Sequence, residues 1–144
     1  MTDLTTNFPV LLSILVVLLI TSCNPIASSH IDANVPKPED FLRFLDRDLA
    51  AYFSAAGIDV ARVEYEMLRE GPTQTGIAYP KFYVWVRAID KIGTAEEGAA
   101  SVAAVDQDHF VVTDYLSKQN ILSNPVSIEK VFPKAVCEKI RLKK

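Results

Sequence analysis

Residues 38–57 read PEDFLRFLDRDLAAYFSAAG, and the rest of the architecture can be built around the element that they predict. Pro38 suits the first position of a helix, and the two acidic residues after it lie where the helix dipole favours negative charge. Gly57 stands where a left-handed helix cap is wanted. Apolar residues between them recur at steps of three and four and form one stripe: Phe41, Leu45, Leu49, Tyr52, Phe53 and Ala56. We therefore predict an amphipathic helix over residues 38–56 that a sheet or another helix must cover.

Four segments after this helix have the character of strands. They span residues 60–69, 81–89, 99–105 and 110–116. Polar or turn-rich residues at 70–80 and 90–97 separate the first three segments. The last two are joined by residues 106–109, a connection of hairpin length. This order predicts a four-stranded, mostly antiparallel sheet.

The chain after the fourth strand predicts short helical pieces. Ser117 can cap a turn that runs to Leu122, and Asn124 with Pro125 begins a last helical segment that Pro133 must interrupt or restart. The fold class is therefore α+β: a long N-terminal helix packed on the sheet, with a short C-terminal helical segment and the helices on one sheet face. Residues 38–144 form a single domain in this prediction.

This order of elements resembles the nuclear-transport-factor-2-like and cystatin-like small α+β domains. The resemblance covers most of the chain after residue 37, and it lies in the order of the elements, with no sequence motif behind it. Some members of the first fold are immunity proteins that neutralise the toxins of neighbouring bacteria. Others are enzymes or ligand-binding modules, so the fold alone does not choose a function.

An apolar run lies near the N-terminus, from Val10 to Ile20. Its eleven residues are all aliphatic except Ser13. A helix that crosses a bilayer needs about 20 apolar residues, whereas the apolar core of a secretory signal has about 7–15. The run therefore predicts an export signal, followed by small residues at Thr21 and Ser22.

Cys23 follows these small residues directly. Ile20, Thr21, Ser22 and Cys23 together resemble the lipobox of bacterial lipoproteins. The resemblance implies cleavage before Cys23, so that residues 1–22 are the signal peptide and Cys23 carries acyl chains that anchor the chain in a membrane. Asn24 after the cysteine implies delivery to the outer membrane, facing the periplasm, if the cell has two membranes.

The leader departs from this pattern in its charge. Export signals normally begin with positive charge, but residues 1–9 hold Asp3 and no Lys or Arg. The alternative is an uncleaved hydrophobic tail with an incidental cysteine. Residues 23–37, rich in proline and serine, form the predicted tether, and His30 within it is a solvated linker residue.

Composition limits the functions of the remaining chain. Removing the first 22 of the 144 residues leaves 122, with 15 basic and 17 of the 18 acidic side chains, a net charge of −2. Nucleic-acid binding normally requires a clustered basic surface, and we expect no such partner. Once Cys23 carries lipid, Cys137 is the remaining thiol, so no internal disulfide can form.

Few residues carry the chemistry of catalysis or metal binding. His109 lies at the tip of the predicted hairpin with Asp106 and Asp108, and three ligands on one turn make a weak metal site. Cys137 is more consistent with a buried, inert thiol than with a reactive one. We predict no catalytic residue, metal or cofactor.

The second strand carries the residues that most suggest binding. If its alternate residues pack under the first helix, Tyr83, Trp85 and Arg87 project from the opposite face, together with Arg62, Glu64 and Glu66 of the first strand. Aromatic residues and arginine dominate protein–protein hot spots, which predicts partner binding by Tyr83, Trp85 and Arg87. In the alternative, Trp85 is buried by the C-terminal segment and Arg87 pairs with a glutamate.

The sequence therefore predicts a lipid-anchored protein of the cell envelope whose small domain binds a protein partner without catalysis. An immunity-like or envelope-assembly role follows from the fold resemblance alone. The alternative is a small-ligand-binding or enzymatic domain that uses a cavity between the first helix and the sheet, lined by Tyr52, Tyr65 and Met67.

Overall fold

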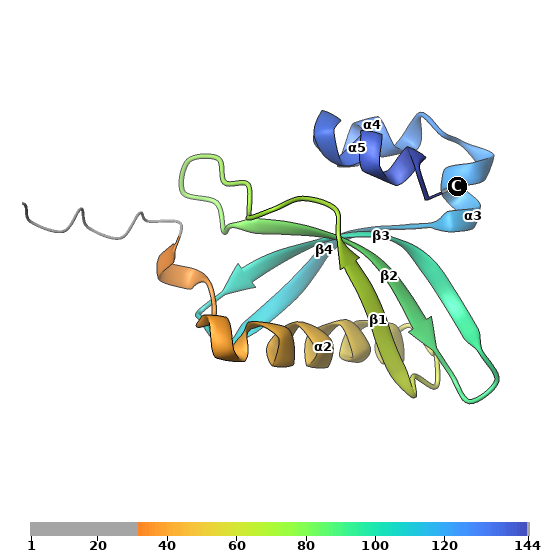
Figure 1. Ribbon diagram of the computed structural model, residues 1–144, viewed down its shortest axis with the longest axis horizontal. Helices are drawn as coiled ribbons and strands as arrows, with labels where there is room; N and C mark the ends of the chain where they lie inside the picture. Colours follow the sequence, from red (N-terminus) through yellow and green to blue (C-terminus); the bar gives the residue numbers. More distant parts are fainter. Residues whose placement is uncertain (1–31, 144) are drawn as a thin grey trace, which may run out of the picture.

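The computed structural model describes residues 32–143, which form a four-stranded sheet with helices on both of its faces (Figure 1). The predicted α+β fold is confirmed, with the N-terminal helix packed on an antiparallel sheet and short helices at the C-terminal end. The helices are η1 (Asp32–Asn34), α2 (Pro38–Ala55), α3 (Lys118–Ser123), α4 (Ser127–Val131) and α5 (Lys134–Arg141), and the strands are β1 (Arg62–Met67), β2 (Lys81–Ile89), β3 (Thr94–Val105) and β4 (His109–Ser117).

Helix α2 begins at Pro38 as its sequence predicts and ends at Ala55, one residue before the predicted end, and Ala56 of the predicted stripe is exposed. Pro38 occupies its first turn, and Leu45, Leu49 and Phe53 are its fully buried side chains. The helix stops before Gly57, whose backbone adopts a φ of 90° in the left-handed region that favours glycine. The amphipathic pattern therefore determines which face of α2 meets the sheet.

The sheet is an antiparallel meander in the order β1-β2-β3-β4. Strand β2 begins and ends as predicted, but β3 starts at Thr94, inside the segment expected to be a loop. The reason is the tight connection before it, because the Asp90 carboxylate accepts hydrogen bonds from the backbone N–H groups of Ile92 and Gly93 at 2.7 and 2.8 Å. This turn sends Glu96 and Glu97 back alongside β2, where they pair with Ala88 and Arg87.

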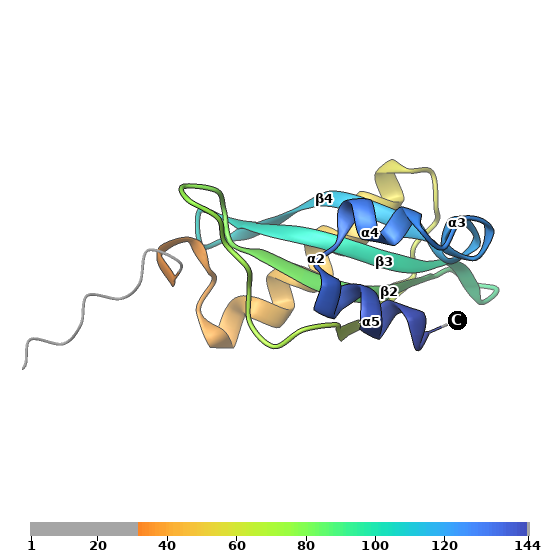
Figure 2. The same ribbon diagram turned by 90° about the horizontal axis from the view of Figure 1, so that it is seen from above.

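Two separate cores lie on the two faces of the sheet. The first lies under α2, whose Leu45, Leu49 and Phe53 are buried in one cluster with inward-facing residues of β2, β3 and β4. The second lies under α3, α4 and α5, seen from above in Figure 2. The expectation that helices cover one face is therefore corrected, because the C-terminal helices bury the other face.

The C-terminal helices are short because their sequence interrupts them. The Ser117 side chain caps α3 by accepting a hydrogen bond from the backbone N–H of Asn120, as predicted, and Pro133 separates α4 from α5. Their buried residues pack on Leu68, Tyr83 and Trp85: Ile121, Ile128, Phe132, Val136, Cys137 and Ile140. Each helix is too short to be stable alone, so it depends on this contact with the sheet.

The chain before α2 is packed on the domain where the structure describes it. Val35 lies against the first core, Pro36 is buried, and the backbone N–H of Gln107 donates to the carbonyl of Asn34 at 3.1 Å. Residues 32–37 of the predicted tether therefore belong to the folded part. Cys23, His30 and the predicted signal peptide lie outside the described residues. Within residues 32–143, no helix combines the length and the apolar character needed to span a membrane.

Candidate functional site

Three charged residues form a row across the sheet, on the face that carries the C-terminal helices. In the strand register Arg87 of β2 stands opposite Glu64 of β1 on one side and opposite Glu97 of β3 on the other. Opposite charges at directly paired positions attract each other across the strands. The register therefore places one guanidinium between two carboxylates.

Arg87 and Glu64 make the shortest contact in this row. The Arg87 Nη2 atom donates to Glu64 Oε2 at 2.6 Å, and Arg62 donates to the other oxygen of Glu64 at 3.1 and 3.2 Å. The Arg87 side chain remains 48% exposed. An ion pair this exposed contributes little to stability, about 0–1 kcal/mol, so its charges are available to other groups.

Glu97 connects the row to the second core. Its Oε1 atom accepts a hydrogen bond from the indole N–H of Trp85 at 2.9 Å, and its Oε2 atom lies 3.1 Å from Lys118 Nζ at the start of α3. Burial by itself raises the pKa of Glu97, but the hydrogen bonds from Trp85 and Lys118 outweigh it and hold the pKa below its ordinary value. Glu97 is therefore held as a carboxylate.

The C-terminal segment supplies a further charged residue to this site. Lys143, just after α5, donates from Nζ to the carboxylate of Glu66. The C-terminal segment is thus attached to the sheet at both of its ends, by Lys118 at the start and Lys143 at the finish. A surface pocket of about 390 Å³ lies beside the row and is lined by these residues: Glu64, Tyr65, Glu66, Trp85, Arg87, Glu97 and Lys143. We refer to it as the charged pocket.

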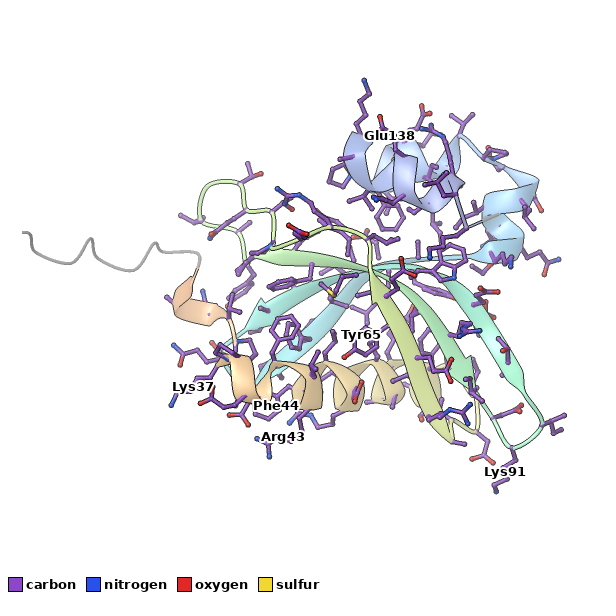
Figure 3. All side chains as sticks on the ribbon, viewed as in Figure 1. Lys37, Arg43, Phe44, Tyr65, Lys91 and Glu138 are labelled. Carbon is purple, nitrogen blue, oxygen red and sulfur yellow. The ribbon has the colours of Figure 1, made fainter. Side chains whose placement is uncertain are left out.

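Tyr65 contributes to this pocket from a strand position that alternates with those of the glutamates. Its side chain points toward α2, as labelled in Figure 3, and packs against the first core. Burial first, and then the nearby Asp46 carboxylate, raise the pKa of Tyr65 to about 12. The phenol therefore keeps its proton at neutral pH.

Two of the three predicted partner-binding residues are buried. Trp85 is 6% exposed, and Tyr83 packs edge-to-face on Phe132 with 6.2 Å between ring centroids. The Tyr83 hydroxyl is 2.5 Å from the hydroxyl of Thr73. Arg87 is exposed and pairs with Glu64. The structure therefore has the alternative arrangement, in which the C-terminal segment buries Trp85 and Arg87 pairs with a glutamate. Tyr83 and Trp85 cannot contact a partner unless the C-terminal helices move, whereas Arg87 can.

The other residues considered for chemistry occupy structural positions. His109 Nδ1 lies 2.6 Å from Asp108 at the exposed hairpin, and the Asp108 carbonyl accepts from Arg47 of α2 at 2.7 Å. Within residues 32–143, no group of three His, Cys, Asp or Glu side chains is arranged to hold a metal ion. Cys137 is buried, and its burial raises the pKa of the thiol, which disfavours the reactive thiolate.

The residues proposed to line a cavity between the first helix and the sheet do not face one open space. Tyr52 packs edge-to-face on Phe53 and Tyr115, and Met67 is exposed at the end of β1. The interface itself is filled by Leu45, Leu49 and Phe53.

Sequence reasoning missed two residues of the charged pocket, Glu97 and Lys143, and also Lys118, which pairs with Glu97. Glu97 lies in the segment expected to be a loop, and Lys118 and Lys143 lie more than 20 positions away from it and from each other along the chain. Trp85, Arg87 and the glutamates of β1 did carry a signal, because the alternation along each strand predicts that they share one face. Comparison with known proteins finds no matching protein-family model, no matching curated protein and no matching solved structure.

Proposed function

We propose that this chain is a lipid-anchored protein of the cell envelope whose domain binds a protein partner through the charged pocket, without catalysis. The observation that supports the proposal best is the row of Glu64, Arg87 and Glu97, held on three rigid strands at the surface. An immunity-like or envelope-assembly role belongs to the same proposal and is supported only by the resemblance in fold.

The pairing within the pocket supports binding of charged groups. Each carboxylate is already matched with a cation, Glu64 with Arg87, Glu66 with Lys143 and Glu97 with Lys118. Because exposed pairs are weak, a partner can exchange its own charges for them at little cost and gain specificity from their fixed order. The hydrogen bonds from Trp85 and Lys118 hold the pKa of Glu97 below its ordinary value, so this side chain is a carboxylate at neutral pH, which favours recognition of a charged group over proton transfer.

The lipid anchor can be tested at the cysteine that would carry it. Replacing Cys23 with serine should abolish acyl labelling and leave the precursor uncleaved before residue 23, because the thioether bond needs the sulfur. Metabolic labelling with a palmitate analogue and the mass of the purified protein measure the result. A Cys23→Ser variant that is processed and partitions with membranes like the parent chain would show that the anchor is wrong.

The binding surface can be tested by reversing the central charge of the row. Arg87→Glu should lower the yield of partner cross-links about tenfold or more, because it places three carboxylates together and repels the groups that Arg87 would meet. In-cell cross-linking from a photoreactive residue in place of Arg62, which contacts Glu64 but does not line the charged pocket, measures the yield. Thermal melting is measured in parallel, and the loss of stability should stay within about 2 kcal/mol, since the lost ion pair is exposed and the new repulsion between opposing strands is of similar size.

Lys91→Glu is the matched control for this variant. Lys91 lies just after the same strand, pairs with Asp59 at 3.3 Å and is 82% exposed at its side chain, but it is outside the charged pocket. The change in net charge is identical, so cross-linking should remain at the parent level. Equal cross-link yields from Arg87→Glu and Lys91→Glu would place the partner elsewhere.

A further inference from the structure

The end of the domain at which the described chain begins exposes apolar side chains. Leu42 in the first turns of α2 and Ile77 and Tyr79 in the loop between β1 and β2 are exposed, and Ile77 is 99% accessible. Single exposed apolar residues are common on soluble proteins and need no explanation. The loop that carries Ile77 and Tyr79 lies beside η1, which leads into the first turns of α2, at one end of the molecule in both views (Figures 1 and 2).

An apolar pocket of about 410 Å³ lies at the same end. Its lining joins residues 35–42, at and before the start of α2, with Pro72 in the loop and Phe82 at the start of β2. The base of the loop is fixed by paired backbone hydrogen bonds between Thr73 and Lys81, at 2.8 and 2.9 Å. The loop and the helix therefore present their apolar side chains from a defined position.

The length of the chain limits how far this end can be from a membrane anchor. Eight residues, 24–31, separate Cys23 from Asp32. Even fully extended, eight residues span at most roughly 30 Å. If Cys23 carries lipid, as proposed above, the exposed apolar residues of this end are held within a few nanometres of the bilayer surface.

The charges at this end are nearly balanced. Lys37, Arg43 and Arg69 are exposed here, and they are offset by Glu39, Asp40 and Glu70. Arg43 and Asp40 form an ion pair at 2.5 Å, and Arg43 stacks over the Phe44 ring at 4.7 Å. Figure 3 labels Lys37, Arg43 and Phe44 at this end of the domain. This balance makes the apolar side chains, rather than electrostatic attraction to anionic lipid, the source of any affinity for a bilayer.

We propose that Leu42, Ile77, Tyr79 and the apolar pocket beside them form a membrane-docking face, which rests on the phospholipid headgroup layer when lipid on Cys23 holds the chain. This inference rests on the proposed lipid anchor. Tyrosine is favoured at this depth because its ring is apolar and its hydroxyl is polar. Two or three side chains bind a bilayer weakly in solution, but anchoring converts docking into an intramolecular step at high effective concentration.

The test uses the full chain expressed in cells, purified with its lipid and reconstituted in phosphatidylcholine vesicles. An environment-sensitive fluorophore is attached at Ile77→Cys or, as the matched control, at Ile92→Cys. Ile92 is 97% exposed in the turn between β2 and β3, at the opposite end of the domain near Lys91 (Figure 3). Cys137 is buried and should not react, and labelling of the unsubstituted chain checks this.

The fluorophore at position 77 should show a blue-shifted emission that rises severalfold in vesicles and is quenched by spin-labelled lipid. The fluorophore at position 92 should behave as it does in buffer. Adding Leu42→Glu, remote in sequence from position 77 and in the lining of the apolar pocket, should return the emission of position 77 toward its value in buffer.

Equal emission and quenching at positions 77 and 92 would overturn the docking face. A blue shift at position 77 that spin-labelled lipid does not quench would overturn it too, because a second copy or another part of the chain would then cover the face. The mass of the purified protein separates this inference from the proposed function. A chain without lipid shows failure of the anchor, whereas a lipid-bearing chain with equal probes shows failure of docking alone.

Discussion

Replacing Trp85 with alanine should lower the free energy of unfolding by about 3–5 kcal/mol, the cost of removing a large aromatic side chain from a core. Trp85 is 6% exposed and packs in the cluster that joins the sheet to the C-terminal helices. The same substitution removes the hydrogen bond from its indole N–H to Glu97, which leaves that partly buried carboxylate with one donor fewer. Urea denaturation followed by circular dichroism measures the loss.

Trp85→Phe separates the packing from the hydrogen bond. The phenyl ring retains most of the apolar contact but cannot donate to Glu97, so this variant should lose only about 1.5–3 kcal/mol, the value of a hydrogen bond to a charged group. Tyr79→Ala, at an exposed aromatic residue outside this cluster, should change stability by less than about 0.5 kcal/mol. A Trp85→Ala variant with parent stability but reduced partner cross-linking would contradict the burial of Trp85 and would favour the aromatic pair as a binding surface.

Replacing Gly98 with alanine should destabilise the domain by about 3 kcal/mol, at the upper end of the usual cost of overpacking. An added Cβ atom at this position would lie 2.2 Å from the carbonyl oxygen of Leu116 and 2.9 Å from Cα of Ser117. Both are backbone atoms of the paired strand β4, so a change of rotamer cannot relieve the clash. Strands β3 and β4 must separate locally, which would weaken the neighbouring hydrogen bond from the Tyr115 hydroxyl to Glu96.

Gly93→Ala is the control for this substitution. Gly93 lies in the turn before the same strand, and an added Cβ atom there meets nothing within 4 Å. Its stability should change by less than about 1 kcal/mol, and the direction can be favourable, because alanine restricts the unfolded chain more than glycine does. Similar melting temperatures for Gly98→Ala and Gly93→Ala would show that the two strands do not approach as closely as described.

Part of the charged pocket was visible in the sequence. The alternation along residues 60–69 and 81–89 placed Glu64, Trp85 and Arg87 on one face, and the structure keeps them there. The pairing of Arg87 with a glutamate was one of two alternatives, because alternation defines a face but not the register between strands. A shift of the register by one residue would have moved each opposing side chain to the other face.

The amphipathic pattern of residues 38–56 and the period of two in the strands determined the elements, their order and the α+β class. These features are local, because each depends on the spacing of apolar residues within one segment. The Ser117 cap and the left-handed Gly57 are equally local, and both were predicted correctly.

Only the tertiary structure decided which face the C-terminal helices cover. Ile128, Val136 and Ile140 required burial, but their spacing does not say whether they pack beside α2 or across the sheet from it. Tyr83 and Trp85 supplied the large apolar surface that these short helices need, so an aromatic face predicted to bind a partner is instead covered by the chain itself. The same packing brought Lys118 to Glu97 and Lys143 to Glu66, because contacts between distant segments depend on how complete elements pack and not on the residues next to them in sequence.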